Sequence, residues 1–354
     1  PIMLPFKAVG LGAVFTAAFI GGIFQMYIGK ILKPIRHMFP PLVTGIVVLM
    51  IGVSLLKVGF MYAGGGGWLM NNKPEIFGNA SHLFIAFTVL IVALVAHQKG
   101  KGMVSSASIL IGMIAGYVVA MLLGMVNYGK ITSADWFALP IPFQYGVDFV
   151  WGAIILMLFM SIVTTIETIG DISATTMGGA NREATDKELS GGIMADGLGT
   201  AVGSIFNAMP NTSYSQNAGL VAFTGVISRH VGTVAGIILV LLGLFPKLGG
   251  IIAAMPESVI GGAAIIMFGL ITAAGIKLIA QSEMSQKNIL ILALSLSFGI
   301  GMSLLPQFVA HIPDFGIQFK LLLTTGLIPA GILAFVLNAT LPVSYTHLTL
   351  PTKA

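Results

Sequence analysis

Ten long apolar segments, each almost free of charged residues, recur along the chain and constrain its fold more than any other feature. A helix of about 20 apolar residues is long enough to cross the hydrocarbon core of a bilayer. Only 8% of the residues are charged, whereas a soluble domain has about 25%, so lipid must be the solvent for most of the chain. The predicted membrane spans cover roughly residues 9–30, 41–62, 80–97, 103–127, 148–170, 190–206, 229–246, 257–280, 287–304 and 321–341.

An irregular eleventh crossing is predicted over about residues 211–228. Cytoplasmic loops carry an excess of Lys and Arg. Ten basic residues fall in one set of connections and five in the other, which places the first set in the cytoplasm. This alternation stays in phase only if 211–228 counts as a crossing. The net charge of +5 therefore reflects topology and not nucleic-acid binding, and we expect a multi-pass protein of a bacterial cytoplasmic (inner) membrane.

Two of these spans share a pattern that indicates an internal repeat. The spans that begin at Pro41 and Pro256 each contain two glycines seven residues apart. The topology places these spans in opposite directions, as an inverted repeat requires.

Cysteine is absent, and the six histidines are scattered without metal-ligand spacing. An intramembrane enzyme would need a nucleophile–base pair or a metal cluster. These features argue against an enzyme, and we predict neither a metal nor a cofactor other than a proton as coupling ion.

Three acidic residues are the first candidates for a functional site, because they lie within or beside apolar spans. An ionisable group at membrane depth costs at least ~2.5–3.5 kcal/mol and therefore faces a partner, a cavity or a solute. Glu167 and Asp171 are four residues apart, so they share one helix face. Asp196 lies in a glycine-rich stretch. For Asp171 and Asp196 the alternative is that they cap helices near the cytoplasmic surface.

The polar stretch from Asn211 to Thr224 is the second candidate site. Pro210 disfavours a helix before it, and the pattern becomes helical from Gln216 onward. We predict a discontinuous span, in which a short strand precedes a half-helix whose N-terminal N–H groups face mid-membrane. The amides of Gln216 and Asn217 could recognise a flat ring with alternating C=O and N–H groups. The alternative is an ordinary polar loop on the outer surface.

Several motifs together resemble the nucleobase–ascorbate transporters, also called nucleobase–cation symporters, and within them the xanthine and urate permeases. The signature runs from Gln216-Asn-Ala-Gly219 to Thr224-Gly225 and continues through Ser228-Arg229. The stretch 165–175 resembles the eighth span of that family and 191–196 its ninth. The resemblance covers nearly everything from about residue 8 to 342.

This resemblance implies an all-α polytopic fold with two inverted repeats of seven spans. The core (transport) domain would comprise 8–31 and 148–247, and the gate domain 32–127 and 256–342. The eleven crossings would correspond to the fourth to fourteenth spans, so we expect an N-terminally truncated chain. The polar residues 343–354 are expected to be a non-native tail. Gate-domain contacts imply a homodimer.

The resemblance also implies a function, namely the import of a purine nucleobase, xanthine or urate, by proton symport. The position of Glu167 would bind the ring N–H groups, and that of Gln216 the other edge. Other expected substrate-site residues are Tyr214, Ser215, Asn217 and Gly219, and the remaining motif residues are Thr224, Gly225 and Arg229. Glu167, Asp196 or Asp171 would couple the proton. The alternatives are a uracil or other nucleobase permease and a sulfate-type anion transporter of the same fold; the Glu167 carboxylate argues against the anion.

Overall fold

The computed structural model describes residues 10–31, 40–214, 217, 221, 225–309 and 323–341, without the side chain of Ser106. This part of the chain is helical, and no strand occurs within it. The long helices are α2 (Leu11–Lys30), α4 (Pro41–Ala63), α6 (Ala80–Lys99), α8 (Ser108–Leu122), α10 (Trp151–Ala180), α11 (Asp186–Ile205), α13 (Arg229–Gly243), α15 (Glu257–Ala280), α16 (Gln286–Leu304) and α18 (Leu327–Thr340). Shorter helices are α5 (Gly67–Asn72), α7 (Met103–Ser106), α9 (Gly129–Thr132), α14 (Pro246–Ala253) and the 3₁₀ turn η2 (Pro306–Val309).

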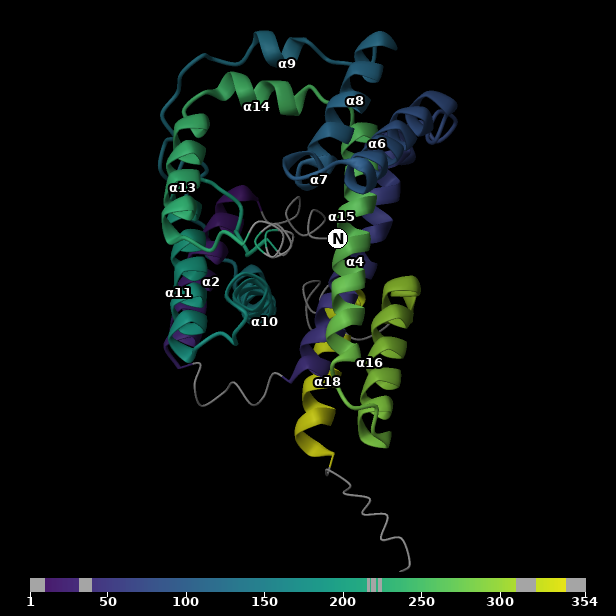
Figure 1. The fold of residues 1–354 in the computed structure, drawn as a ribbon. Helices are drawn as coiled ribbons and strands as arrows, with labels where there is room; N and C mark the ends of the chain where they lie inside the picture. The colour runs from purple at the N-terminus through teal and green to yellow at the C-terminus, as the bar shows by residue number, and fades with distance from the viewer. Residues whose placement is uncertain are drawn as a thin grey trace, which may run out of the picture.

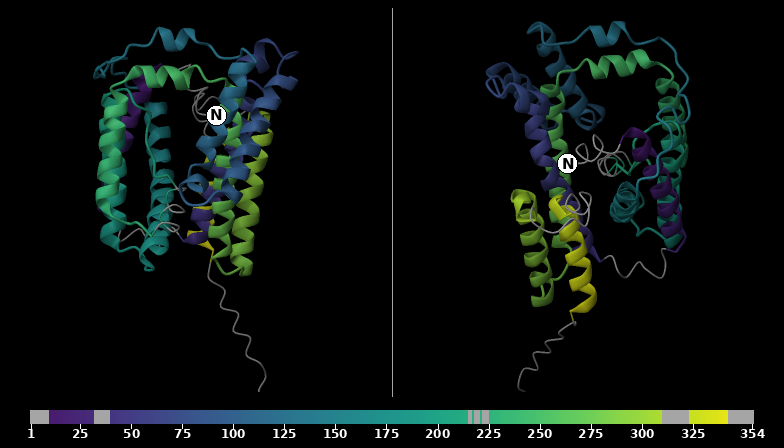
Figure 2. Two further views of the ribbon diagram at one scale, coloured as in Figure 1. Left: turned by 45° about the horizontal axis from the view of Figure 1, so that its top comes forward. Right: turned by 180° about the vertical axis from the view of Figure 1, so that it is seen from behind.

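The long helices stand in two groups side by side (Figure 1). In one group α2 packs against α10 and α11, with α13 on the same side; in the other, α4 packs against α15, α6 against α8 and α15, and α18 against α4 and α16. Figure 2 shows the same division from two further directions. The first group falls within 8–31 and 148–247, and the second within 32–127 and 256–342. That they act as core and gate domains stays a prediction.

Glycines let the helices of each group approach through their backbones. A Cβ atom on Gly52 of α4 would lie 2.5 Å from the Thr272 nitrogen of α15, and one on Gly275 would lie 2.4 Å from the Leu49 nitrogen. Such contacts between small residues are typical of helix pairs in membranes. Of the repeated glycines at the two span starts, Gly45 and Gly52 face α15.

The surface of the described helices is largely apolar, as the span prediction requires. On α13 no residue is buried, and Ile237 and Leu239 are 55% and 69% exposed. Among the described residues, six helices are long and apolar enough to cross a membrane: α2, α4, α6, α10, α15 and α16. The pair α13–α14, bent by 83°, would be a seventh, and α8 and α18 are shorter apolar helices. These lengths fit a multi-pass membrane protein.

Several element boundaries differ from the prediction. Helix α10 continues ten residues past the apolar run that ends at Gly170, because no proline interrupts it. It ends at Ala180, and its C-cap residue Asn181 adopts the left-handed conformation. The span predicted over 103–127 divides into α7 and α8 at Ala107 and ends at Leu122. The strand predicted near 211–214 is wrong, since these residues carry no strand and no partner strand exists in the described chain. A strand forms only where a second strand accepts its ladder hydrogen bonds.

Two short connectors join the helix groups. Helix α9 lies between α8 and α10, and α14 lies between α13 and α15, and the two cross the gap next to each other (Figures 1 and 2). Lys130 Nζ of α9 donates to the carbonyl of Ala253, 2.9 Å away at the end of α14. Lys247 Nζ of α14 donates in turn to the carbonyl of Thr132, the last residue of α9, at 3.4 Å and to that of Ala134, just past α9, at 2.9 Å. Each connector therefore contributes a lysine to the C-terminal end of the other, where a cation is favoured.

Candidate functional site

Asp196 is the centre of a polar cluster inside the first helix group. It lies on α11 and is 9% exposed. Its Oδ2 accepts hydrogen bonds from Gln25 Nε2 of α2 at 2.8 Å and from Thr168 Oγ1 of α10 at 2.9 Å. Its Oδ1 accepts a bond from Asn211 Nδ2 at 2.6 Å. One carboxylate thus binds α2, α10 and the segment that follows α11.

The local sequence explains why that segment turns back along α11. Helix α11 begins with a capping box, in which the Thr185 hydroxyl accepts from the Glu188 N–H and the Glu188 carboxylate accepts from the Thr185 N–H. It ends at Ile205, and Asn207 adopts a positive φ of 63°. Asn207 Nδ2 donates to the Ile141 carbonyl at 2.7 Å. The chain reverses there, so Asn211 lies beside Thr200, whose hydroxyl donates to the Asn211 side-chain oxygen at 2.9 Å.

Three consecutive residues of the returning segment each bind a different carboxylate. Asn211 binds Asp196, as above; Thr212 Oγ1 donates to Glu167 Oε2 at 3.2 Å; and Ser213 Oγ donates to Asp171 Oδ2. Glu167 and Asp171 are one turn apart on α10, as their spacing predicted, and both are half-buried. These three carboxylates, Glu167, Asp171 and Asp196, form an acidic row that faces residues 211–213 along their length.

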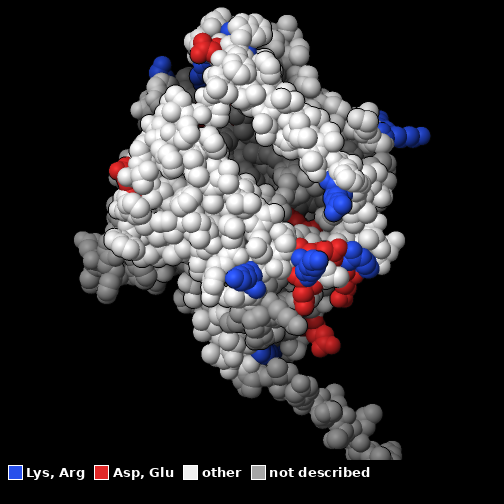
Figure 3. Space-filling model, turned by 90° about the vertical axis from the view of Figure 1, so that its left-hand side faces the viewer, with Lys and Arg blue, Asp and Glu red and all other residues white. Residues whose placement is uncertain are grey.

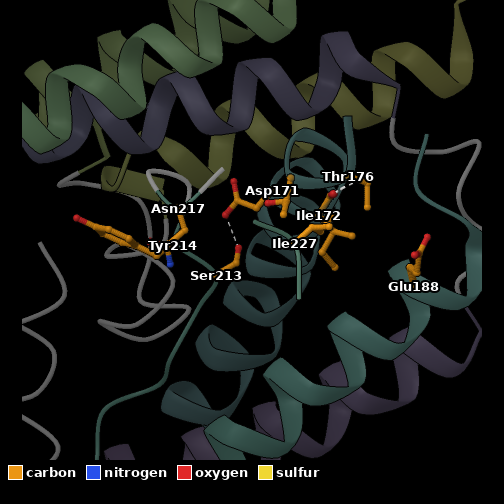
Figure 4. Close-up of a pocket in the computed structure, with 9 residues that line it drawn as sticks. Asp171, Ile172, Thr176, Glu188, Ser213, Tyr214, Asn217 and Ile227 are labelled. Atoms are coloured by element: carbon orange, nitrogen blue, oxygen red, sulfur yellow. Dashed lines mark hydrogen bonds between the residues drawn. The ribbon is translucent and has the colours of Figure 1, made fainter. Parts of the chain in front are cut away.

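A cavity of about 350 Å³ opens beside Asp171, at one end of this row. Its described lining includes Asp171 and Thr175 of α10, Ser213, Tyr214 and Asn217. Figure 4 shows the Ser213 hydroxyl directed at Asp171, with Tyr214 and Asn217 next to them. The Tyr214 hydroxyl lies 3.8 Å from the Met267 sulfur on α15. The cavity wall therefore reaches the second helix group.

Charged side chains gather where α10 ends and α11 begins, and one of them, Glu188, lines the cavity. The turn between α10 and α11 and the first turn of α11 contain Arg182, Glu183, Asp186, Lys187 and Glu188. Arg182 forms a bidentate ion pair with Glu188 at 2.6 and 2.8 Å. Figure 3 shows red and blue residues close together on the lower part of one face, a largely uncharged middle and a few further charged residues near the margins. The polar cluster of Asp196 thus lies inward from a solvated turn.

The structure brings together five of the residues that the sequence singled out: Glu167, Asp171, Asp196, Tyr214 and Asn217. Gly225 adopts a positive φ of 68°, and Arg229 begins α13 without a bond to the acidic row. Four others lie outside the described residues: Ser215, Gln216, Gly219 and Thr224. No group of acidic or histidine residues in the described part has an arrangement that could hold a metal ion.

Sequence reasoning missed Gln25 and Thr168, which bind Asp196. It placed Asn211, Thr212 and Ser213 in the polar candidate stretch but did not pair them with the carboxylates. Gln25 carried a usable signal, because it is an amide inside a predicted apolar span. A buried polar side chain in a span needs a partner within the protein.

Comparisons with known proteins identify relatives that are membrane permeases. Residues 4–308 match Xan_ur_permease, described as a permease family. A putative purine permease of Clostridium perfringens is 37% identical over 97% of this chain and 74% of its own length. The xanthine permease XanP of Escherichia coli is 35% identical over 94% of this chain and 72% of its own length. The uric acid permease PucJ of Bacillus subtilis is 34% identical over 93% of this chain and 73% of its own length.

A solved structure shares the fold. The transmembrane domain of a cyanobacterium bicarbonate transporter, BicA, aligns with a TM-score of 0.50 at 15% identity, over 93% of this chain and 77% of that one. At this identity the likeness concerns the fold alone.

The fold and its apolar helices define a multi-pass membrane protein with the seven-plus-seven fold. The chain belongs to the Xan_ur_permease family, whose curated relatives are permeases and not enzymes. The resemblance to the nucleobase–ascorbate transporters drawn from its motifs is confirmed.

Proposed function

We propose that this chain carries a purine nucleobase, xanthine or urate, into a bacterial cell across the cytoplasmic membrane by proton symport. Relatives over more than nine-tenths of the chain are named for xanthine and for uric acid. The structural observation that supports the proposal is the row of carboxylates along 211–213 beside a cavity.

The chemistry of the row suits a flat ring with several N–H and C=O groups. Carboxylates accept N–H hydrogen bonds, whereas the Asn217 amide both donates and accepts. The cavity of about 350 Å³ is within the usual range for small-molecule sites, ~300–1,000 Å³. A site built on acidic groups repels a compact, doubly charged anion without N–H donors, so the acidic row disfavours the sulfate-type alternative.

We assign the coupling proton and the ring contact to Glu167. Asp196 accepts three hydrogen bonds and is integral to the packing of α2, α10 and α11. Glu167 accepts one, from Thr212 at 3.2 Å, among the described residues. A carboxylate with open acceptor positions can take up a proton and a ring N–H in turn. The helix groups would then move relative to each other and expose the site to the cytoplasm.

Uptake of labelled xanthine by proteoliposomes, driven by an imposed proton gradient, tests this function. Glu167→Gln should abolish accumulation, because the neutral amide cannot carry the proton. Glu183→Gln is the matched control, since Glu183 is exposed in the α10–α11 turn, and it should transport normally. Competition by urate, hypoxanthine, uracil and sulfate identifies the solute class. Normal accumulation by Glu167→Gln would refute the assignment.

A further inference from the structure

Gln25 is a buried amide in the middle of an apolar helix. It lies on α2 and is 2% exposed. In a membrane span, no bulk water is available to satisfy such a group. Its Nε2 instead donates to Asp196 at 2.8 Å, across 171 residues of sequence. The side chain therefore has a specific partner that only the tertiary fold provides.

Asp196 depends on neutral donors for its carboxylate. The three side chains that bind it, Gln25, Thr168 and Asn211, are all uncharged. Hydrogen bonds to a carboxylate are stronger than those between neutral groups, and a buried acceptor that loses one pays a desolvation cost. Each donor thus restricts where the carboxylate can point.

The backbones around this pair leave little room for adjustment. One turn before Gln25, a Cβ atom on Gly22 would lie 2.6 Å from the Gly197 carbonyl oxygen and 2.6 Å from the Ala201 nitrogen. Gly197 follows Asp196 directly, and a Cβ atom there would lie 2.6 Å from the Gly22 oxygen. Helices α2 and α11 are in backbone contact here, so the Gln25 amide and the Asp196 carboxylate are held at a fixed separation.

The position of Asp196 also affects residues 211–213, which contact the acidic row. Asp196 binds Asn211, and the next two residues bind Glu167 and Asp171. We propose that Gln25 is a positioning residue for the substrate site, which fixes Asp196 and, through Asn211, the register of 211–213 against α10. This inference rests on the proposed function of that site, although Gln25 itself is not among the described residues that line the cavity.

The first experiment replaces Gln25→Leu, which removes the amide and keeps the size. Initial uptake rates of xanthine should give a KM raised about tenfold or more, because the segment loses its fixed register, with kcat changed far less. Gln98→Leu makes the same chemical change at an exposed position of α6 and should leave both constants unaltered. An unchanged KM in Gln25→Leu would overturn the proposal.

An exchange of roles separates positioning from a general loss of packing. Gln25→Glu places two carboxylates opposite each other and should impair uptake severely. In the double variant Gln25→Glu/Asp196→Asn, an amide again faces a carboxylate, with donor and acceptor exchanged. Xanthine exchange without a proton gradient should recover in the double variant to within a few-fold of the parent KM. A double variant that inserts normally and is as impaired as Gln25→Glu would refute the pairing.

Hydrogen–deuterium exchange gives a readout that needs no solute. Peptides covering residues 211–214 should exchange faster in Gln25→Leu than in the parent or in Gln98→Leu. Faster exchange together with a parent that transports no purine would retain the positioning role and reject the proposed substrate. Unchanged exchange together with normal xanthine kinetics in Gln25→Leu would reject the positioning role and retain the substrate.

Discussion

Carboxylates in the α10–α11 site and lysines in the α9–α14 connectors both bind neutral partners, but their surroundings differ. Asp196 is 9% exposed, and its donors Gln25 and Thr168 are 2% and 3% exposed. In the connectors, Lys130 is exposed and Lys247 is half-buried. Water can replace a lost partner at the connectors, whereas the buried interior of the first helix group offers Asp196 no such substitute.

The difference teaches which bonds the molecule depends on. At the site, each neutral donor compensates a charge placed inside a helix group, so its removal exposes that charge to an apolar environment. At the connectors, each lysine contacts the C-terminal end of a helix, where the helix dipole favours a cation and water also solvates the ammonium group. Deleting one partner should therefore lower the free energy of unfolding by about 1.5–3 kcal/mol at the site and by about 1 kcal/mol or less at the connectors.

The largest effect is expected where the site relies on backbone contact. Gly22→Leu would drive a side chain into Gly197 and Ala201, whose atoms lie 2.6 Å from the Cβ position. Relief requires α2 and α11 to separate, at a cost above ~3 kcal/mol. We expect loss of the monodisperse protein in size-exclusion chromatography after mild detergent extraction. Gly232→Leu on exposed α13, where nothing lies within 4 Å, is the control; a normal profile for Gly22→Leu would contradict the close contact.

The next effect concerns the charge itself. Asn211→Leu removes the 2.6 Å donor to Asp196 Oδ1, and a hydrogen bond to a charged group contributes about 1.5–3 kcal/mol. Proton-driven xanthine uptake should fall at least tenfold, and the unfolding temperature should decrease. Asn72→Leu removes an exposed bond to the Trp68 carbonyl and should leave uptake intact. Equal effects of the two substitutions would remove the distinction between buried and exposed partners.

The sequence predicted the acidic half of this site because charges are rare in apolar spans. Glu167, Asp171 and Asp196 were visible for that reason. Their pairing with neutral partners was not predictable, since the Gln, Thr and Asn that bind Asp196 lie 15 to 171 residues from it and local patterns contain no information on such pairs. Tertiary packing alone selects them from many similar side chains.

The helical fold was predictable to a similar extent, and the errors in its prediction have related causes. Apolar length located most long helices, but not the end of α10, whose last ten residues are mostly polar or small and still helical. The connectors were also missed, because α9 and α14 have only 4 and 8 residues, too few for a helical period to show. The predicted strand near 211–214 required a partner that the described chain does not contain.

A smaller effect is expected at the connectors. Lys247→Met removes bonds to two carbonyls and the contact with the Trp136 ring, 5.3 Å away, and should lower the free energy of unfolding by about 1 kcal/mol. Lys130→Met, which removes one carbonyl bond, should cost less. Thermal unfolding in detergent measures both. The control is Lys73→Met, an exposed lysine 6.0 Å from the Trp68 ring. If Lys247→Met lowered the stability as much as Asn211→Leu, the difference between buried and exposed bonds would be refuted.

The smallest effect on transport is expected from joining the connectors covalently. A Cβ atom on Gly250 would lie 3.1 Å from the Ala134 Cβ, close to the ~3.5–4.5 Å of disulfides. The chain has no cysteine, so Ala134→Cys/Gly250→Cys should form a single bond on mild oxidation, detected by a mobility shift on non-reducing gels.

The oxidised variant distinguishes a static brace from a moving part. The reciprocal lysine bonds and the backbone contact at Gly250 favour connectors that stay paired while the helix groups move. Xanthine uptake should then remain within twofold of the reduced protein. An arrest of uptake that reductant reverses would show that α9 and α14 separate during each cycle. The connectors would in that case take part in transport, as the acidic row is proposed to do. The two regions would then differ only in how deeply their polar groups are buried.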